Sequence, residues 1–160
     1  MPIVVTGISA FSSYPDLESV TLPSTIKTID SSAFKFCQDL TSVNLPQGLQ
    51  TIGREAFYEC QKLTGVVFPS SLKSIGQMAY YGCDAIGKVI IPKTVEQLEA
   101  QVFWNCYRIS IYCEPTELPA RWHNAWSTYI ECIWYSENKP TTKGTYWHYV
   151  DGVPTVWEVV

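Results

Sequence analysis

Hydrophobic residues recur along this chain with a period of 23 positions, and polar residues hold fixed places between them. In the stretch 17–22, Val20 and Leu22 share one face of an extended segment, while Ser19 and Thr21 share the other. This alternation with a period of two predicts a half-buried strand, and each later unit repeats it. A proline ends every strand, because it removes a backbone donor. These prolines are Pro23, Pro46, Pro69 and Pro92.

A second short extended piece follows each proline, as in residues 49–52, and a turn comes next. Gly53 and Gly76 stand at that turn, where glycine permits a positive φ, and Asp30 can serve in the same way. Glu99 takes this place in the fourth unit, so we expect that unit to turn differently.

The last part of each unit reads as a helical turn, as in residues 54–60. Ala56 and Cys60 would share one face of such a turn, and their small side chains would let it lie close against the strands. Repeats of this length stack into a solenoid, in which parallel strands lie ~4.8 Å apart and like residues form columns. The pattern therefore predicts a short, curved, right-handed solenoid dominated by β-structure.

Four cysteines keep the same period as the hydrophobic residues: Cys37, Cys60, Cys83 and Cys106. Disulfides between neighbouring units are disfavoured, because in-register side chains hold the Cβ atoms near ~4.8 Å, beyond the usual ~3.5–4.5 Å. A spacing of 23 also resembles no zinc-binding pattern. We interpret these cysteines as a reduced, buried column, since free cysteine behaves as a small hydrophobic residue.

The period breaks after Cys106, because Ile111 follows it by five positions where earlier valines follow their cysteines by six. All six tryptophans lie at or beyond position 104. Sugar binding by these rings is one interpretation, but a cap that covers the open end of the solenoid is favoured. Trp122 and Trp126 are four positions apart, so a short helix would point both rings at the last unit.

The other two cysteines, Cys113 and Cys132, break the period and flank the last unit. They could form a bridge, or they could simply fill the end of the core, and we favour the filling. Sequence alone cannot assign connectivity. The cysteines therefore do not identify the compartment in which the protein works.

The C-terminal tail has the pattern of a β-hairpin. Asp151-Gly152 suits a primed two-residue turn, and Pro154 should keep the second strand of the hairpin at a sheet edge. Polar residues, proline and glycine in 136–144 predict a loop or linker. The predicted strands of this region are residues 132–135, 145–150 and 153–160.

Length and composition suit one folded domain with a short tail. The chain has 160 residues, of which 46% are hydrophobic, so it can bury a core. We divide it into residues 1–135, the solenoid with its cap, and 136–160, the linker and hairpin. The net charge is −4 and no basic stripe is present, which argues against nucleic acid as a partner. No apolar run approaches the ~20 residues that span a bilayer, so membrane insertion is not expected.

The N-terminal end offers two expectations. Residues 1–5 are too short, and lack the positive start, for a secretory signal. The protein is therefore cytosolic, cut from a longer precursor, or exported with a partner. The strand edge near Ile3, Val5 and Val20 has no evident cap, so a preceding module or a second copy would pack there, which makes self-association possible.

Candidate chemistry is sparse. His123 and His148 have no partner at ligand spacing and no nucleophile motif nearby, so we treat them as packing or surface residues. Acidic residues are dispersed and the repeat suggests no cleft in which acid, base and nucleophile would converge. We expect no catalytic residue, no metal ligand and no cofactor, and we do not expect an enzyme.

A ligand would sit on the outward residues of the stacked strands, on the concave face. Val67, Ile90 and Tyr112 make an apolar stripe there, and exposed apolar patches and tyrosines often mark interfaces. A polar face with few charges suits a protein or a glycan. The candidate ligand-binding residues are Asn44, Val67, Lys88, Ile90 and Tyr112.

The unit LPxxLxxIGxxAFxxCxxLxxV, carried by residues 22–112, resembles the BspA-like bacterial leucine-rich repeats of surface-antigen type. The segment IYCEP…RWHNAWS…CIWY resembles the cap that closes such arrays in gut Firmicutes, and GTYWHYVDGVPTVW resembles a hairpin often found after that cap. The resemblance implies an α/β, horseshoe-like leucine-rich-repeat solenoid that binds other macromolecules. It also implies surface or secreted proteins linked to adhesion, with no shared catalytic site.

These observations together predict a non-catalytic recognition module with adhesin-like binding of a protein or glycan. The resemblance implies a place at the cell surface or in the secreted fraction, as part of a longer precursor. The alternative is a structural or decoration component of a phage virion, because similar arrays occur in genes of gut phages.

Overall fold

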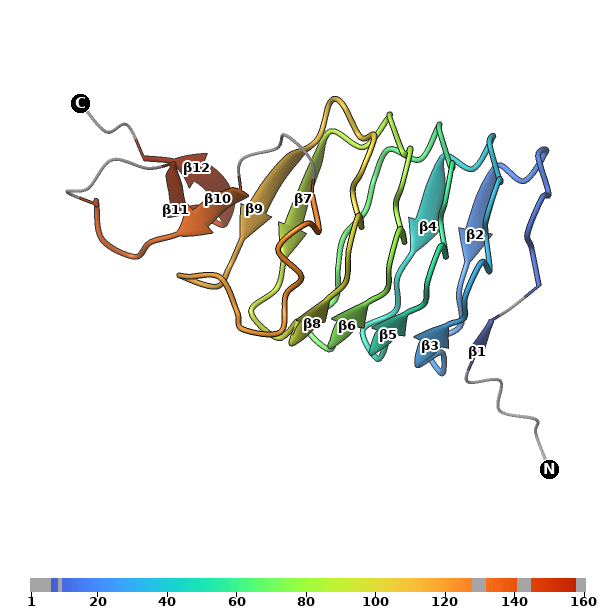
Figure 1. Cartoon of the computed structure of the whole chain (residues 1–160), viewed down its shortest axis with the longest axis horizontal. Coiled ribbons are helices and arrows are strands. Elements are labelled where there is room, and N and C mark those ends of the chain that lie inside the picture. The colour runs from blue at the N-terminus through green and yellow to red at the C-terminus, as the bar shows by residue number, and fades with distance from the viewer. Residues whose placement is uncertain (1–6, 9, 128–131, 141–144, 158–160) are drawn as a thin grey trace.

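The computed structural model describes residues 7–8, 10–127, 132–140 and 145–157. The chain winds into stacked coils along one axis, with its N-terminal coil at one end and a β-hairpin at the other (Figure 1). Short strands form two columns along the stack, and no helix occurs among the described residues. The predicted solenoid is confirmed, whereas the prediction of a helical turn in each unit is wrong.

One column forms a parallel sheet in which each strand pairs with its equivalent in the next coil. Thr28, Thr51, Ser74 and Gln97 occupy matching register positions, so the repeat period sets the pairing. Four of its strands carry a buried residue, such as Ile52, that belongs to the core. In sheet order the strands are β1 (Gly7–Ile8), β3 (Thr28–Ile29), β5 (Thr51–Ile52), β6 (Ser74–Ile75) and β8 (Gln97–Leu98).

The second column, which we call the strand wall, is divided into two sheets (Figure 1). The predicted alternation holds, because Val43 and Val89 are buried while Asn44 and Lys88 are exposed. The first sheet contains β2 (Ser19–Thr21) and β4 (Ser42–Asn44). The second contains, in order, β7 (Lys88–Ile91), β9 (Ser110–Cys113), β10 (Cys132–Tyr135), β11 (Tyr146–Val150) and β12 (Val153–Val156).

The stretch predicted to be a helical turn is instead a run of tight turns, which we call the turn edge. Within residues 54–60, alternate amides bond to carbonyls three positions back, and the amides between them bond to the next coil, as Phe57 does to Ala79 at 2.7 Å. Glu55 and Glu59 have positive φ angles of 56° and 57°, which a right-handed helix does not allow. A helix would use every amide within the segment, and here half of the amides hold the coils together.

The glycines before the turn edge serve a purpose that differs from the prediction. Gly53, Gly76 and Asp30 do not have a positive φ. In each of these units, the residue with a positive φ stands two positions later. A Cβ on Gly53 would lie 2.6 Å from the Ser31 nitrogen, so glycine is needed for close approach of the coils. The Glu99 unit follows the same course as the others, which corrects the expectation of a different turn. Its Gln101 has the same positive φ, 60°.

Replacing Gly53 with alanine should lower the free energy of unfolding by about 1–3 kcal/mol, because the added methyl group would meet fixed backbone. Gly65→Ala is the matched control, since a Cβ there has nothing within 4 Å. That control should change stability by less than about 0.5 kcal/mol. Chemical denaturation measures both values, and equal stability of the two variants would contradict the close approach.

Aromatic rings form the central column of the core. The ring centroids of Phe11, Phe34, Phe57, Tyr80 and Phe103 lie 5.5, 5.2, 5.0 and 5.6 Å apart in turn, with nearly parallel planes. From Phe34 onward these side chains have no solvent exposure. The period predicted from the sequence thus places like residue over like residue.

The four periodic cysteines form a second buried column of free thiols, as predicted. Each Sγ donates to a backbone carbonyl of the preceding coil, for example Cys60 to Phe34 at 3.1 Å and Cys83 to Phe57 at 3.0 Å. Burial raises the pKa of the Cys60 and Cys106 thiols to about 12. These thiols therefore stay protonated and serve as packing groups.

A disulfide joins Cys113 to Cys132, which overturns the favoured interpretation that they fill the core end unbridged. It links β9 to β10 at the end of the stack. Trp122 and Trp126 cover this end as predicted, but through turns in place of a helix. The Trp122 indole donates to the Val95 carbonyl at 3.0 Å.

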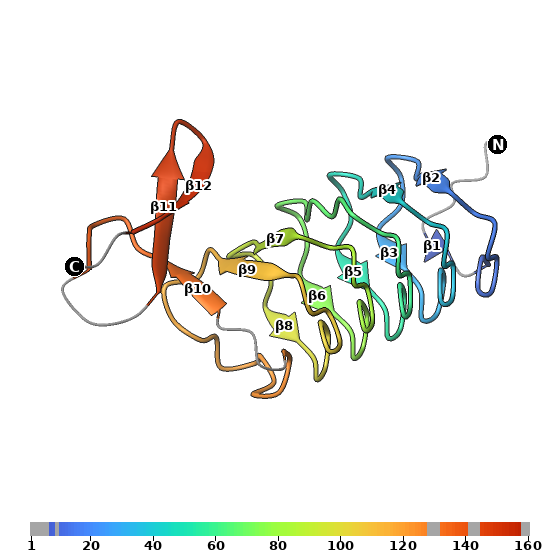
Figure 2. The ribbon, with the colours of Figure 1, turned by 90° about the horizontal axis from the view of Figure 1, so that it is seen from above.

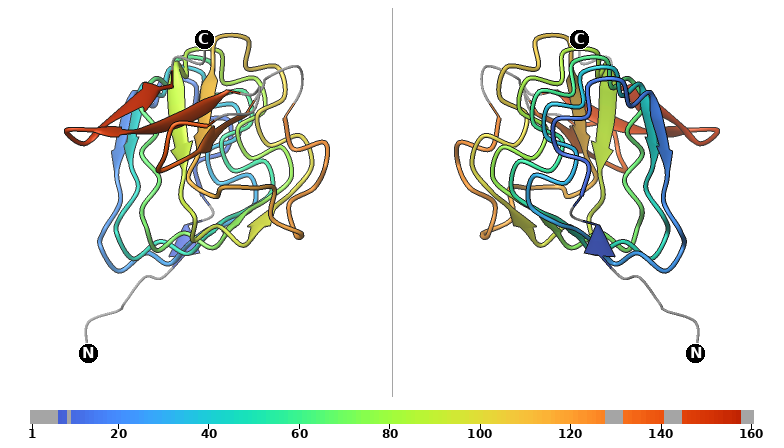
Figure 3. Two further views of the ribbon diagram at one scale, coloured as in Figure 1. Left: turned by 90° about the vertical axis from the view of Figure 1, so that its left-hand side faces the viewer. Right: turned by 90° about the vertical axis from the view of Figure 1, so that its right-hand side faces the viewer.

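The C-terminal hairpin is confirmed in β11 and β12. Asp151 and Gly152 have φ angles of 50° and 77°, as a primed turn requires, and β12 with Pro154 lies at the sheet edge. The hairpin projects away from the face of the strand wall (Figures 2 and 3). Its pairing with β10 continues the sheet across the predicted linker.

Some predictions fall on residues outside the described part of the chain. Ile3 and Val5, at the predicted uncapped edge, belong to this group, as do residues 141–144 of the loop and 158–160 of the last strand. Val20, by contrast, is half-buried and pairs with Val43 of the next coil.

Candidate ligand-binding site

The strand wall is split between its third and fourth coils. Residues 65–68 do not form a strand, and apart from one bridge between Gly65 and Ser42 they take no part in a sheet. Among the described residues, no backbone hydrogen bond joins 64–68 to 87–91. The equivalent bond is present on both sides, from Thr64 to Thr41 at 3.1 Å and from Ser110 to Gly87 at 2.9 Å.

The residues around the split disfavour strand pairing at this point. Gly65 takes the place of Ser42 in the preceding unit and Gly87 takes the place of Thr64, and glycine weakens a strand. Phe68 takes the place of leucine or isoleucine, and its ring packs edge-on against Tyr80 at 5.7 Å. Tyr80 adds a hydroxyl group to the phenylalanine column, and this hydroxyl is buried without a hydrogen-bond partner. The core beneath the split therefore holds bulkier side chains than the core of the neighbouring coils.

A hollow of about 310 Å³ opens over the split, which is at the small end of the range for ligand pockets. One lip belongs to the third coil and the other to β7, while the hairpin closes one side. Val67 is 77% exposed in this position, an unusual state for a valine. The lining residues are Val66, Val67, Phe68, Ser70, Lys88, Ile90, Pro92, Glu114 and Tyr149.

Hydrogen bonds fix the hairpin beside the hollow. The Tyr149 hydroxyl donates to one carboxylate oxygen of Glu114 at 3.0 Å, and the backbone N–H of Lys93 donates to the other at 3.0 Å. Burial, together with this bond to Glu114, raises the pKa of the Tyr149 phenol to about 12, so it remains a donor at neutral pH. Trp147, a residue of β11, is fully buried, and its indole donates to the Cys113 carbonyl at 3.0 Å.

The structure brings together three of the five predicted ligand-binding residues. Val67, Lys88 and Ile90 line the hollow from both of its lips. Tyr112 lies beside them, because it pairs in register with Ile90 and the Lys88 ammonium is 5.9 Å from its ring centroid. Whether these residues bind a ligand remains a prediction.

Asn44 lies apart from the hollow, and its side chain is occupied. Its amide oxygen accepts a bond from the backbone N–H of Leu22 at 2.6 Å, and its amide nitrogen donates to the Leu22 carbonyl at 3.3 Å. The sequence reasoning missed Phe68, Glu114 and Tyr149. The departure of Phe68 from leucine or isoleucine was visible in the repeat, whereas the hairpin pattern gave no hint of what its tyrosine would contact.

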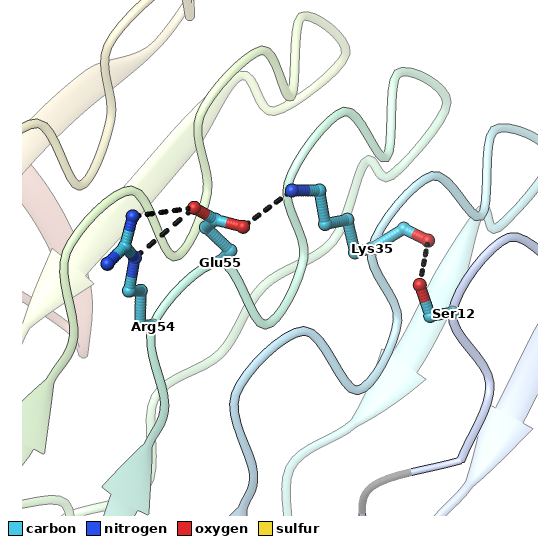
Figure 4. A network of polar contacts seen from close by, with 4 residues as sticks. All are labelled: Ser12, Lys35, Arg54 and Glu55. Carbon is cyan, nitrogen blue, oxygen red and sulfur yellow. Dashed lines mark hydrogen bonds and ion pairs between the residues drawn. The ribbon is translucent and has the colours of Figure 1, made fainter.

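A separate polar network lies on the turn edge (Figure 4). Glu55 accepts from the Lys35 ammonium and pairs with Arg54 at 3.2 Å, while Ser12 donates to the Lys35 carbonyl at 3.4 Å. The hydrogen bond from Lys35 is the main reason that the pKa of Glu55 lies below its usual value. Because its oppositely charged side chains pair with one another across neighbouring coils, we infer that the network stabilises the stacking of the coils.

Other kinds of site find little support in the described part of the chain. No cluster of three or more histidine, cysteine or acidic side chains is arranged there to hold a metal ion. The same residues include no helix long and apolar enough to cross a membrane. The hollow on the strand wall is therefore the best candidate for a functional site.

Comparison with solved structures relates the chain to bacterial leucine-rich repeat proteins. A protein from T. pallidum is 34% identical with a TM-score of 0.66, and the match covers 70% of this chain and 53% of that one. One from Bacteroides ovatus is 30% identical, with a TM-score of 0.65 and coverage of 74% and 30%. A leucine-rich cell surface protein from Faecalibacterium prausnitzii is 26% identical, with a TM-score of 0.64 and coverage of 88% and 45%. The chain thus spans about half or less of the length of these relatives.

Among curated proteins, none matches the chain significantly. The family model for the BspA-type leucine-rich repeat region matches residues 5–118 with six copies of the repeat. This range covers most of the chain and includes the strand wall from β2 to β9. The protein therefore belongs to the BspA-type leucine-rich repeat family.

Proposed function

We propose that this chain is a non-catalytic recognition module that binds a macromolecular ligand, a protein or a glycan, in the corner between the strand wall and the hairpin. The observation that carries the proposal is the hollow over the split, because it gathers Val67, Lys88 and Ile90 beside the fixed Tyr149. An exposed apolar patch with tyrosine at its rim is typical of interfaces.

The family and the disulfide support a location at the cell surface, as part of a longer protein. The F. prausnitzii relative is a cell surface protein, and the T. pallidum relative is longer than the matched region. The disulfide between Cys113 and Cys132 suits an oxidising compartment, since such bonds are rare where thiols are kept reduced.

A binding role is favoured over catalysis by the chemistry of the hollow. Its one carboxylate, Glu114, accepts hydrogen bonds on both oxygens, from Tyr149 and from the backbone of Lys93. A carboxylate held in this way is a structural link between hairpin and solenoid. Family members generally act as binding modules, in agreement with this arrangement.

The proposal predicts that charge changes in the hollow weaken binding while the fold is kept. Wild-type protein would be screened against immobilised matrix proteins and a glycan array, and its best ligand compared with Val67→Asp and Lys88→Glu variants. We expect at least a roughly tenfold loss of affinity in each, since a buried like or unpaired charge costs more than 1.4 kcal/mol.

Thr21→Asp is the matched control, because Thr21 is exposed in the same outward column but lies in β2, far along the wall. It should bind like the wild type. Equal binding by all three variants would refute the location, and the absence of any protein or glycan ligand would refute the function.

A further inference from the structure

We infer that the ligand of this hollow is an extended polypeptide segment that adds as a strand to the free edge of β7 and carries an apolar and an acidic side chain. This inference rests on the proposed function and specifies its ligand class. Strand addition of this kind uses backbone hydrogen bonds for affinity and alternate side chains for specificity.

The direction of the backbone groups of β7 carries the argument. Gly87 and Ile91 direct their carbonyls to β9, because they accept bonds from Ser110 at 2.9 Å and from Glu114 at 3.0 Å. In a parallel pair alternate residues bond to one neighbour, so the backbone groups of Lys88 and Ile90 point to the other side. That side is the split, where residues 64–68 offer them no backbone partner.

An unpaired strand edge is a template for another extended chain. The neighbouring strand β9 has no such free edge, since it pairs with both β7 and β10. The backbone groups at the split are regularly spaced along β7. Another backbone, with the same spacing of donors and acceptors, is the partner that complements them.

The side chains around the split favour a peptide over a sugar. Val66, Val67, Phe68, Ile90 and Pro92 give the hollow a mostly apolar lining. A sugar would need several hydrogen-bond partners, and the Glu114 carboxylate is already engaged on both oxygens. A valine, leucine or isoleucine side chain from an added strand would instead fill this space.

Lys88 adds a preference for an acidic neighbour. Its ammonium lies 5.9 Å from the Tyr112 ring centroid and forms no ion pair with a carboxylate among the described residues. A glutamate or aspartate beside the apolar side chain of the peptide would pair with it at the lip of the hollow. The predicted ligand therefore combines an extended backbone, one apolar anchor and one acidic residue.

The test begins with a display library of random peptides of about seven residues, the length of a common strand, selected on the wild-type protein. We expect the selected peptides to share alternating apolar residues and at least one acidic residue. A synthetic peptide of the enriched sequence would then be titrated against variants of Ile90. Failure to enrich any peptide would overturn the inference.

Ile90→Pro removes the N–H that faces the split and leaves the bonds to β9 intact, so the fold should tolerate it. It should weaken peptide binding about tenfold or more, because it removes one backbone bond and obstructs the edge. Ile90→Val is the matched comparison, since it keeps both the N–H and an apolar branched side chain, and it should lose clearly less affinity than Ile90→Pro. Equal losses in both variants would overturn strand addition.

Hydrogen exchange of the wild-type protein gives an independent answer, even if Ile90→Pro fails to fold. The Ile90 amide should exchange faster than the paired amides of β9 in the free protein, and it should become protected when the peptide binds. Binding without protection of Ile90 would overturn the inference but leave the proposed function intact. Selection of a glycan in the screen, with no peptide bound, would do the same.

Discussion

Replacing Phe57 with alanine should lower the free energy of unfolding by about 3–5 kcal/mol, as in other fully buried aromatic positions. The ring has no solvent exposure and lies between Phe34 at 5.2 Å and Tyr80 at 5.0 Å. Its removal leaves a cavity that neighbours cannot fill, because backbone bonds on the turn edge fix the spacing of the coils. Two stacking contacts are lost at once.

The matched control is Tyr107→Ala, which removes an aromatic ring that is 80% exposed. It should change stability by no more than about 0.5 kcal/mol. Both values come from urea denaturation followed by circular dichroism, with wild-type protein measured beside them. If the two substitutions lower the free energy of unfolding by the same amount, the aromatic column does not stabilise the core.

The repeat period predicted the solenoid and its core because both depend on residues one period apart. Every coil offers the same surface to the next, so a residue such as Cys60 or Phe57 needs only its own counterpart as a neighbour. The turn edge was predicted wrongly for a physical reason. Small residues four apart, such as Ala56 and Cys60, suit a helix face equally well, and the periodic pattern does not reveal that alternate amides bond to the next coil.

The candidate site was predictable only as far as the repeat extends. Val67, Lys88 and Ile90 followed from their places in the outward columns of the repeat. Glu114 and Tyr149 come from segments beyond it, and their contact depends on how the hairpin packs against the last coil. Gly65, Gly87 and Phe68 are the residues of the sequence that relate to the split. The pattern of residue types does not tell whether two poor strand formers and one larger core residue together are enough to prevent strand pairing.

Reduction of the disulfide should lower the free energy of unfolding by about 3 kcal/mol, because it releases a closed loop in the unfolded chain. The two cysteines are separated by 19 positions and tie β9 to β10, on which the hairpin and its Tyr149 depend. Thermal unfolding with and without dithiothreitol measures the effect. We expect the hairpin sheet, which is joined to the solenoid through β10, to lose protection first.

The double variant Cys113→Ser/Cys132→Ser is the control, since it should be as unstable as the reduced wild type and insensitive to dithiothreitol. Alkylation separates the bridge from the thiol column. In the folded protein treated with dithiothreitol, the half-buried Cys132 should react with iodoacetamide first. Cys60 and Cys83 should stay unmodified, because they have no exposure and burial raises the pKa of both thiols. If dithiothreitol destabilised the double variant, the column thiols would have to form a disulfide of their own, contrary to their free state and their hydrogen bonds with the carbonyls of the preceding coils.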